Sequence, residues 1–399
     1  MQGAPNSFWM SSTPVTDYPE IQSDLKVDVA IVGGGIVGIT TAYLLKKQGV
    51  KVAVIEADRI LQGTTGHTTA KITSQHHLIY AKLKQQMGQE LAQQYADANE
   101  SAIHLIANTA AENNIDCDFS WRPAYVYTQS ELYLKDLEDE AQAACSLGIR
   151  ASYIDHSPLP FSVKAALRFE NQAQFHPLKY LKSLAQQIPG QGSHILENTT
   201  AIGIDQESRA VITRQGQKVK ADKIIIASHF PFFDGGGMYF TKLDPQRAYI
   251  IAIKAEETFP EGMFISAESP SRSLRSQLYE DGELILIAGE SHPTGEGSNL
   301  QAHYENLLEF ARENFEVTDV LHRWSTQDYQ TLDGIPYVGH LTPKSPHIYV
   351  ATGFDKWGIS NGTASAMVLN DLIVNGDSTW ALVYNPSRFN MTSVKTFVG

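Results

Sequence analysis

The sequence has 399 residues, a length that suffices for two or three domains of ordinary size. Hydrophobic residues make up 42% and charged residues 19%, which is a globular composition and excludes wholesale disorder. The formal net charge is −13, and because an acidic surface repels phosphate groups, we expect no nucleic-acid partner. Two cysteines, Cys117 and Cys145, are too few for a disulfide framework or a four-cysteine metal or iron–sulfur site.

Residues 1–26 form an N-terminal extension without the basic region and apolar run of a secretory signal. The chain contains no stretch of 18 apolar residues, so we expect no membrane span. Together with the few cysteines, these features lead us to expect a cytoplasmic protein. We also expect no bound metal, since histidines and acidic residues do not gather at ligand spacing.

The first informative segment is a strand, a glycine turn and a helix. Residues 27–32 are mostly apolar and β-branched, which predicts a strand buried on both faces, and residues 36–47 predict a helix. Between them, Gly33 permits the tight turn, Gly35 lets a pyrophosphate approach the backbone, and Gly38 lets the helix pack close to the strand. The first helical N–H groups, at Ile36 and Val37, then predict a phosphate site.

A second buried strand is expected over residues 51–55, and Glu56 and Ala57 follow directly after it. Glu56 lies 23 residues after Gly33, where an acid accepts hydrogen bonds from the ribose hydroxyls. A carboxylate there would repel a 2′-phosphate, which argues against NADP. The whole arrangement predicts a dinucleotide-binding fold.

Distant segments favour FAD over NAD. Residues 223–228 and 348–353 read as further buried strands, and residues 360–374 read as a helix. The nucleotide-binding fold therefore starts at residue 27 and finishes near residue 375, whereas most NAD-dependent Rossmann domains are contiguous.

The chain resembles the D-amino-acid-oxidase-like superfamily of FAD-dependent oxidoreductases, which includes glycine and sarcosine oxidases and dimethylglycine dehydrogenases. The matching segments span nearly the whole chain: VAIVGGGIVGITTAYLLKKQGVKVAVIE, GTTGHTTAKIT, FHPLKYLKSLA, KVKADKIIIAS, DGIPYVG and ATGFDKWGIS. The chain is also similar to the oxidase portion of longer bacterial proteins in which a Rieske iron–sulfur module follows. No Cys-x-His pair occurs in this sequence, so that module is absent from it.

The resemblance implies an α/β fold in which a GR2-type, Rossmann-like FAD-binding domain is interleaved with an α+β, mixed-sheet substrate domain. We expect the FAD-binding domain to be discontinuous, over residues 27–95, 151–240 and 326–385. The substrate domain would then occupy residues 96–150 and 241–325, and residues 386–399 would be a tail or a former linker.

By the same resemblance, the segment Gly63–Thr73 contacts the flavin and the pyrophosphate. In the dimethylglycine and sarcosine dehydrogenases, a histidine in a similar G-[ST]-T-W-H motif is covalently joined to the flavin. His67 takes that place here, but Gly66 replaces the tryptophan. A covalent bond, a non-covalent contact and an ordinary loop histidine therefore all stay open for His67. The cofactor residues expected in this segment are Thr64, Thr65, His67, Thr68 and Thr69.

The resemblance also places a late loop against the edge of the flavin where negative charge collects on reduction. Lys356 in this loop could stabilise that charge or bind a substrate carboxylate, or it could be a solvated surface residue. The family often has Thr-Gly where this chain has Ser228-His229, which leaves the local cofactor contact open. The remaining expected cofactor residues are Ala227, Ser228, Gly353, Phe354, Lys356, Trp357, Gly358 and Ile359.

The substrate side offers several candidates. Amino-acid oxidases of this type hold the substrate carboxylate with an arginine, because a guanidinium matches two oxygens. We expect Arg247 and Lys356 to act in catalysis, with Tyr249 and Trp357 as walls of the pocket. At most one of the vicinal pair His76 and His77 would face the site. The other arginines available are Arg122, Arg272 and Arg275.

The sequence therefore predicts an FAD-dependent oxidoreductase that oxidises the C–N bond of an amine or amino acid. Hydride would pass to flavin N5, and the electrons would go on to oxygen or to a redox partner protein. Two alternatives stay open: a non-catalytic FAD-binding electron-transfer subunit, and an NAD-dependent dehydrogenase.

Overall fold

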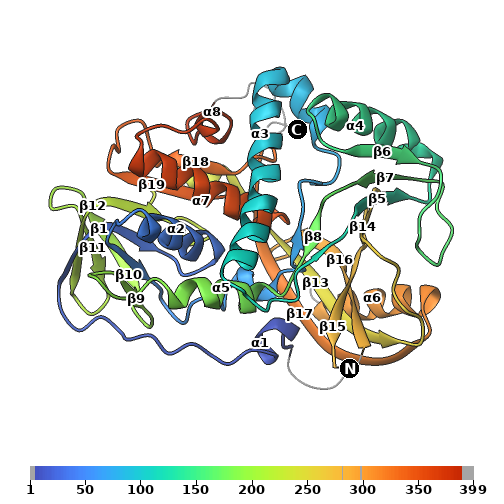
Figure 1. Ribbon diagram of the computed structural model, residues 1–399, viewed down its shortest axis with the longest axis horizontal. Coiled ribbons are helices and arrows are strands. Elements are labelled where there is room, and N and C mark those ends of the chain that lie inside the picture. The colour runs from blue at the N-terminus through green and yellow to red at the C-terminus, as the bar shows by residue number, and fades with distance from the viewer. Residues whose placement is uncertain (1–4, 281, 297–298, 389–399) are drawn as a thin grey trace.

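The computed structural model describes residues 5–280, 282–296 and 299–388. Two large sheets lie side by side, and the long helix α3 (Tyr80–Glu112) runs between the two halves (Figure 1). Gly88 interrupts α3 with a left-handed φ of 83°. Among the described residues, no helix combines the length and apolar character needed to cross a membrane.

The first sheet has a parallel centre in which β1 lies between β2 and β12. Strands from later in the sequence therefore lie on both sides of β1, which makes it a topological switch point. Ligands bind at such points, outside the carboxyl ends of the strands. Its members, in spatial order, are β10 (Ala201–Asp205), β11 (Ala210–Thr213), β12 (Lys218–Ile226), β1 (Leu25–Val32), β2 (Val52–Ile55) and β9 (His194–Leu196), with β19 (Ile348–Thr352) and β18 (Tyr337–His340) beside β12.

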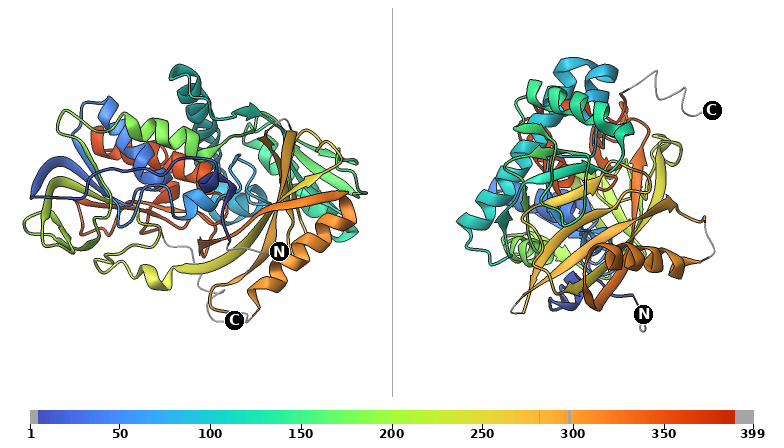
Figure 2. Two further views of the ribbon diagram at one scale, coloured as in Figure 1. Left: turned by 90° about the horizontal axis from the view of Figure 1, so that it is seen from below. Right: turned by 90° about the vertical axis from the view of Figure 1, so that its right-hand side faces the viewer.

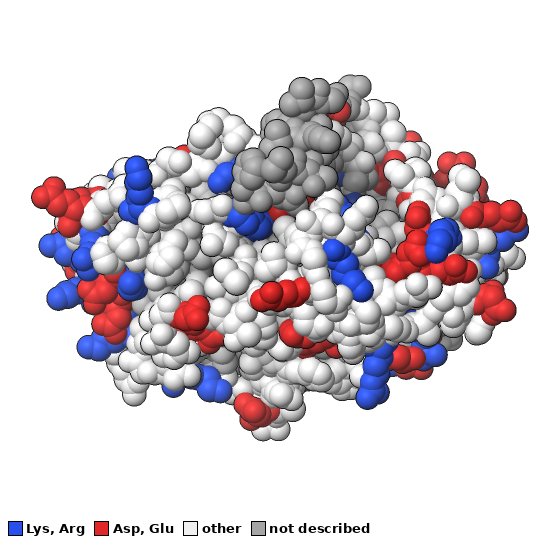
Figure 3. Space-filling view, turned by 90° about the horizontal axis from the view of Figure 1, so that it is seen from above, with Lys and Arg blue, Asp and Glu red and all other residues white. Residues whose placement is uncertain are grey.

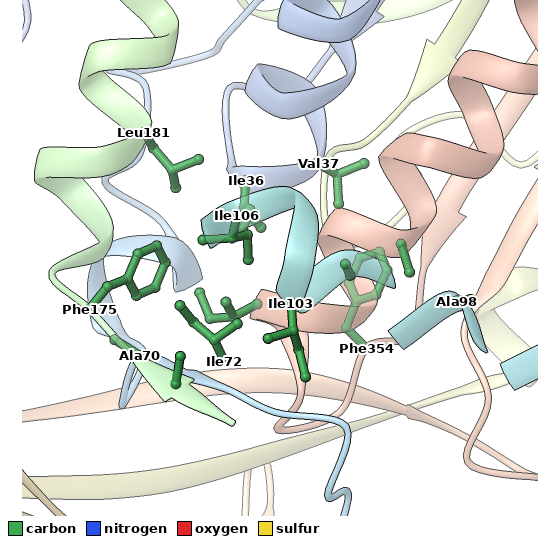
Figure 4. Close-up of a cluster of buried hydrophobic side chains, with 14 of the residues drawn as sticks. Ile36, Val37, Ala70, Ile72, Ala98, Ile103, Ile106, Phe175, Leu181 and Phe354 are labelled. Atoms are coloured by element: carbon green, nitrogen blue, oxygen red, sulfur yellow. The ribbon is translucent and has the colours of Figure 1, made fainter. Parts of the chain in front are cut away.

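Strand β1 is buried on both faces, as predicted. Val29 and Ile31 belong to the apolar cluster on the helix side, whereas Ala30 and Val32 belong to a second cluster on the opposite face. Side chains from α2, α3, α5, β3 and the loop before α7 meet in the first of these clusters (Figure 4). The helices are α1 (Phe8–Ser11), α2 (Ile36–Lys47), α3, α4 (Leu134–Ser146), α5 (Pro177–Gln186), α6 (Leu300–Asn314), α7 (Gly358–Val374) and α8 (Ala381–Tyr384).

The second sheet is mixed: β14 and β5 pair in parallel, and its other neighbours are antiparallel. Helix α6 packs on β13, β16 and β17, so one face of this part of the sheet is covered (Figure 2). The strands in order are β17 (Val317–Thr331), β13 (Leu243–Ala255), β16 (Gly282–Pro293), β15 (Ser273–Tyr279), β14 (Met263–Ser266), β5 (Ala124–Thr128), β7 (Ala165–Phe169) and β6 (Ala151–Ile154). A third, small sheet joins β3 (Lys71–Ile72), β8 (Ala173–Gln174) and β4 (Ser120–Trp121).

The sheets divide the chain differently from the predicted ranges in two places. Strands β6 and β7 and residues 326–331 of β17 fall in the ranges expected for the FAD-binding part, yet they hydrogen-bond in the second sheet. The reason is pairing over long sequence distances, such as Ala124 with Phe169, which no local pattern reveals. Of the expected tail, residues 389–399 lie outside the described part, and Arg388 forms an ion pair with Asp333 at 2.8 Å.

Candidate functional site

A cavity of about 470 Å³ begins at the carboxyl ends of β1, β2 and β12 and extends to one face of the second sheet. It brings together residues from the two ends of the sequence. Among the residues expected to contact the cofactor, those that line it are Gly33, Gly35, Ile36, Val37, Glu56, Ala57, Thr64, Thr65, His67, Thr68, Thr69, Ala227, Ser228, Phe354, Lys356, Trp357, Gly358 and Ile359.

The glycine turn is built by close backbone contacts. Gly33 has a φ of +114°, and a Cβ added to it would lie 2.3 Å from the carbonyl oxygen of Ala227. A Cβ on Gly38 would lie 1.9 Å from the carbonyl oxygen of Gly33. Gly38 does not line the cavity, so its part is to let α2 approach β1. Gly353, the other expected residue away from the lining, has a φ of +81° and leaves no room beside Thr331.

Polar groups surround this turn. The backbone N–H of Ile36, at the start of α2, donates to Thr65 Oγ1 over 3.0 Å. Glu56 Oε2 accepts from the N–H of Gly34 at 2.6 Å, and Oε1 accepts from the N–H of Asp58 at 3.2 Å. The helix terminus and the carboxylate therefore lie where a pyrophosphate and a ribose would each find complementary groups.

The far part of the cavity contains two ionisable residues that the sequence did not single out. Lys71 donates to the carbonyl oxygen of Phe264 at 2.8 Å and to Ser273 Oγ at 2.5 Å. Burial, and then the nearby Arg275, lower the pKa of Lys71 to about 7. Asp328 on β17 is 8% exposed, and burial is the main reason that its pKa is raised to about 8.

Neither residue carried a sequence signal strong enough to find it. Lys71 stands at the end of the expected flavin segment, and Asp328 stands in a strand whose polar and apolar residues do not alternate. Only the strand register shows that Thr326 and Asp328 share one face with Ala248 of β13 and line the cavity.

Two histidines line the cavity and lie close to backbone carbonyl oxygens. His67 Nδ1 lies 2.8 Å from the carbonyl oxygen of Gly63. His229 lines the cavity at the place where the family often has glycine, and its Nε2 lies 2.9 Å from the carbonyl oxygen of Gln327. His229 thus ties the loop after β12 to β17. This is the contact that the Ser228-His229 departure makes.

The vicinal pair His76 and His77 does not line the cavity. The ring of His76 stacks on Trp357, with centroids 5.0 Å apart and an interplanar angle of 24°. His76 Nδ1 lies 2.6 Å from Tyr95 Oη, and its Nε2 lies 2.9 Å from Ser360 Oγ. Burial lowers the pKa of His76 to about 3, so a neutral imidazole supports the indole that lines the cavity.

The arginine clamp is not found among the described residues. Ala248 faces the cavity, whereas Arg247 and Tyr249 lie on the other face of β13, toward α6. Arg247, the arginine expected to act in catalysis, therefore does not line the cavity. Arg247 donates to Ser325 Oγ at 3.2 Å, and Tyr249 stacks on His303 with ring centroids 4.5 Å apart. The other three arginines also have protein partners away from the lining: Arg122 pairs with Glu261, Arg272 with Glu290, and buried Arg275 donates to backbone carbonyls that include Ala70.

The described residues include no group of three or more histidine, cysteine or acidic side chains placed to hold a metal ion. On the face of the molecule in Figure 3, basic and acidic side chains are interspersed. That face therefore offers no extended patch of a single sign to a charged polymer.

Comparison with known proteins points to one family. The family model described as "FAD dependent oxidoreductase" (DAO) matches residues 28–372. A Bacillus subtilis protein named as a Rieske 2Fe-2S iron–sulfur protein, YhfW, is 41% identical over 389 residues, covering 97% of this chain and 76% of that protein.

Solved structures show the same fold. L-proline dehydrogenase from P. horikoshii superposes with a TM-score of 0.78 at 20% identity, covering 92% of this chain and 98% of that one. Glycine oxidase from Geobacillus kaustophilus superposes with a TM-score of 0.75 at 19% identity, covering 92% and 99%. These likenesses establish the mixed α/β architecture.

The residues present fit FAD. The cradle at Gly33 and Gly35 excludes side chains, the start of α2 presents N–H groups, and Glu56 suits a ribose without a 2′-phosphate. The cavity continues past this nucleotide site to the second sheet, which leaves room for a flavin ring beside the start of α7. The chain belongs to the DAO family of FAD-dependent oxidoreductases.

Proposed function

We propose that this flavoprotein oxidises the C–N bond of an amine or amino acid. The observation that carries the proposal is the continuity of the cavity from the nucleotide-binding turn to a buried, partly polar face of the second sheet. Glycine oxidase and L-proline dehydrogenase, which share the fold, are named for amino-acid substrates. Their likeness supports the substrate class, and the family supports the redox chemistry.

FAD supplies the hydride acceptor, at flavin N5. The protein residues bind the cofactor, orient the substrate and exclude water from the site. The start of α2 and Glu56 hold the nucleotide half. The positive end of α7 and Lys356 line the same cavity and would stabilise negative charge on a reduced flavin. Trp357, supported by His76, forms one wall of the site.

The apolar floor of the site comes from the second sheet. Ala248 and Ile250 of β13 and Ala288 of β16 line the cavity, and small side chains there leave space for the carbon skeleton of a substrate. Because these residues exclude water, a bound amine is held close to the hydride acceptor in a low-dielectric environment.

We propose a protein as the physiological electron acceptor. The support is the 41% identity to a protein named for a Rieske iron–sulfur centre. The test compares turnover in air with turnover in the presence of an artificial electron-accepting dye. Faster turnover with the dye, with little peroxide formed in air, is the expected result; fast stoichiometric peroxide formation would assign the role to oxygen instead.

The substrate class is tested by product analysis. A panel of primary amines, secondary amines and amino acids is incubated with the FAD-loaded protein and the dye, and the carbonyl product and the released ammonia or amine are quantified. We expect one carbonyl per two electrons passed to the dye for at least one class. Dye reduction by none of the panel would favour a non-catalytic electron-transfer subunit.

Denaturing the same preparation tests whether His67 is covalently joined to the flavin. Colour in the pellet means a covalent bond, and colour in the supernatant means none.

A further inference from the structure

Asp328 is a buried carboxyl group that faces the cavity without a protein partner. In the described part of the chain, neither a hydrogen bond nor an ion pair within 4.0 Å reaches its side chain, although it is only 8% exposed. Two positions earlier on β17, Thr326 Oγ1 also lines the cavity and also lacks a partner. Two neighbouring polar groups on one face of β17 are therefore left for a ligand.

Such a group is costly to keep. A buried carboxyl that accepts no hydrogen bond loses the hydration of its charged form and gains nothing in return. Burial, and then the neighbouring Asp355, raise the pKa of Asp328 to about 8, while Lys356 acts in the opposite direction. An unpaired group with a strongly perturbed pKa inside a cavity is a candidate for a functional site.

The surroundings of Asp328 define what would bind it. The adjacent surface is apolar, with Ala248 and Ile250 on β13 and Ala288 on β16. Of the lysines that line the cavity in the described part of the chain, Lys71 is held by Phe264 on β14 and Ser273 on β15, which lie four and three strands away from β17. The other, Lys356, lies close enough to lower the pKa of Asp328 and so favours its carboxylate form. The site beside Asp328 therefore combines a carboxyl group with an apolar surface that suits an alkyl chain.

We propose that Asp328 binds the amino group of the substrate, so that the substrate class is a primary or secondary alkylamine that enters as an ammonium cation. This inference rests on the proposed function, which it narrows. An N–H of the ammonium group donates to the carboxylate, a charge-assisted pair that is strong in a buried site. No arginine lines the described cavity and Lys356 is assigned to the flavin edge, which agrees with recognition through the nitrogen rather than through a carboxylate.

The same contact prepares the amine for oxidation. An amine gives up hydride only when its nitrogen is neutral, because the nitrogen lone pair must form the new C=N bond. Asp328 accepts one proton from the bound ammonium: an N–H bond breaks, an O–H bond forms, and the lone pair stays on nitrogen. No electrons leave or enter in this step, and the hydride acceptor is the FAD of the proposed function.

Binding should also release a proton. At neutral pH the carboxyl of the free protein is largely protonated, whereas the ammonium–carboxylate pair has one proton fewer than the separate partners. The charges that act on Asp328 are Asp355 and Lys356, before α7, while His229 after β12 and Lys71 on β3 line the same cavity. Since Lys71 can also lose a proton beside a cation, the diagnostic quantity is the difference between the wild type and a variant at Asp328.

The test is titration calorimetry of the FAD-loaded protein with tert-butylammonium chloride. This cation has no hydrogen on the carbon attached to nitrogen, so it cannot be oxidised, and binding is read independently of turnover. Proton release is obtained at neutral pH from two buffers with different heats of ionisation. We expect the wild type to bind the cation with release of close to one proton, and to bind pivalate, an anion with the same tert-butyl group, at least tenfold more weakly.

Asp328→Asn should bind the cation at least tenfold more weakly and lose most of the proton release. Asp319→Asn, which makes the same change at an exposed position of the same strand, should match the wild type. Asp328→Glu keeps a carboxyl group and should retain cation binding and proton release. This variant tests the proposal even if Asp328→Asn loses FAD. Equal binding by Asp328→Asn and the wild type, tighter binding of pivalate, or no binding of the cation to the FAD-loaded wild type would each overturn the proposal. Failure of the proposed function shows separately, as FAD that no amine reduces.

Discussion

At the scale of single residues, the nucleotide site depends on three glycines whose missing side chains leave space for backbone. Gly33 and Gly38 contact backbone oxygens so closely that any Cβ would overlap them. Gly35 faces the cavity instead, and its hydrogen leaves the backbone accessible to a phosphate. These roles follow from the residue type and the spacing, so the sequence alone predicts them.

Replacing Gly38 with alanine should separate α2 from β1. The added Cβ would lie 1.9 Å from the carbonyl oxygen of Gly33, and a backbone atom cannot move aside cheaply. We expect a loss of about 3 kcal/mol in the free energy of unfolding, at the upper end for overpacking, with a lower FAD content in the purified protein. Urea unfolding and the ratio of flavin to protein absorbance measure the two effects.

Gly203→Ala is the matched control, because no heavy atom lies within 4 Å of the position of its added Cβ and its φ is not positive. If both variants unfold at the same urea concentration, close packing of α2 on β1 is not what requires Gly38.

Asp328 and Lys71 could not be predicted at this scale. A carboxylate or an amine in a strand faces a cavity or the solvent depending on register, and the register of β17 is fixed by β13, more than 60 residues earlier in the chain. Arg247 shows the converse: its residue type suits the chemistry, but the pairing of β13 with β17 directs its side chain toward Ser325.

At the scale of elements, the N-terminal segment supports the cofactor segment. Trp9 in α1 is fully buried, and its Nε1 donates to the carbonyl oxygen of Thr68 over 2.7 Å. Ser7 Oγ donates to the carbonyl oxygen of Gly66. Residues 1–26 read from the sequence as an extension, because a four-residue helix that packs on a distant loop has no periodic pattern of its own.

Trp9→Ala should therefore loosen the segment Gly66–Thr68. Truncation of a fully buried tryptophan removes its packing and one hydrogen bond, so we expect a loss of about 3–5 kcal/mol in the free energy of unfolding. FAD should also dissociate more readily. Thermal unfolding and the rate at which flavin fluorescence appears on dilution measure these effects.

Trp121→Ala, at a site that is 45% exposed, should change either property only slightly. A Trp9→Ala protein with normal stability and normal FAD release would contradict the supporting role of α1.

A buried carboxylate from α4 accepts hydrogen bonds from the first N–H groups of helix α3, a contact that the sequence does not predict. Glu140 of α4 accepts from the N–H groups of Tyr80 and Ala81, each at 2.8 Å. Burial is the main reason that the pKa of Glu140 is raised from 4.5 to about 7. Because the folded-state pKa lies above the ordinary value, stability that is present below about pH 4.5 is lost as the pH rises through 7.

Glu140→Gln removes this ionisation. We expect the stability of the wild type relative to the variant to fall by up to about 3 kcal/mol between about pH 4.5 and about pH 8. Urea unfolding of both proteins across that range measures the difference, with exposed Glu138→Gln as the control. A difference that stays constant with pH, or that grows in favour of the wild type, would show that Glu140 does not titrate in this way.

At the scale of the whole molecule, the cavity joins two sheets that the chain visits alternately. Residues before 80 and after 320 line one space. Figures 1 and 2 show the two halves of the molecule side by side. The sequence predicts the parallel sheet well, since its glycine turn and apolar strands are local signals. The mixed sheet is predicted only in outline, because β5, β6 and β7 join it through long-range pairing.

Removing FAD should therefore destabilise the whole molecule rather than one half. A ligand present at about 100 times its Kd stabilises the folded state by about 2.7 kcal/mol. We expect calorimetry to show one unfolding transition for the FAD-loaded protein and a lower Tm after FAD removal. Two transitions, of which only one shifts on FAD removal, would mean that the cofactor stabilises a single half.

The most direct measurement is the visible absorption of the FAD-loaded protein while amines are added without oxygen. The proposed function predicts that the oxidised-flavin bands bleach with at least one amine or amino acid. They should return when an electron acceptor is admitted. Bands that persist with every amine and amino acid, in a protein that a chemical reductant bleaches readily, would contradict amine oxidation as the activity of this flavoprotein.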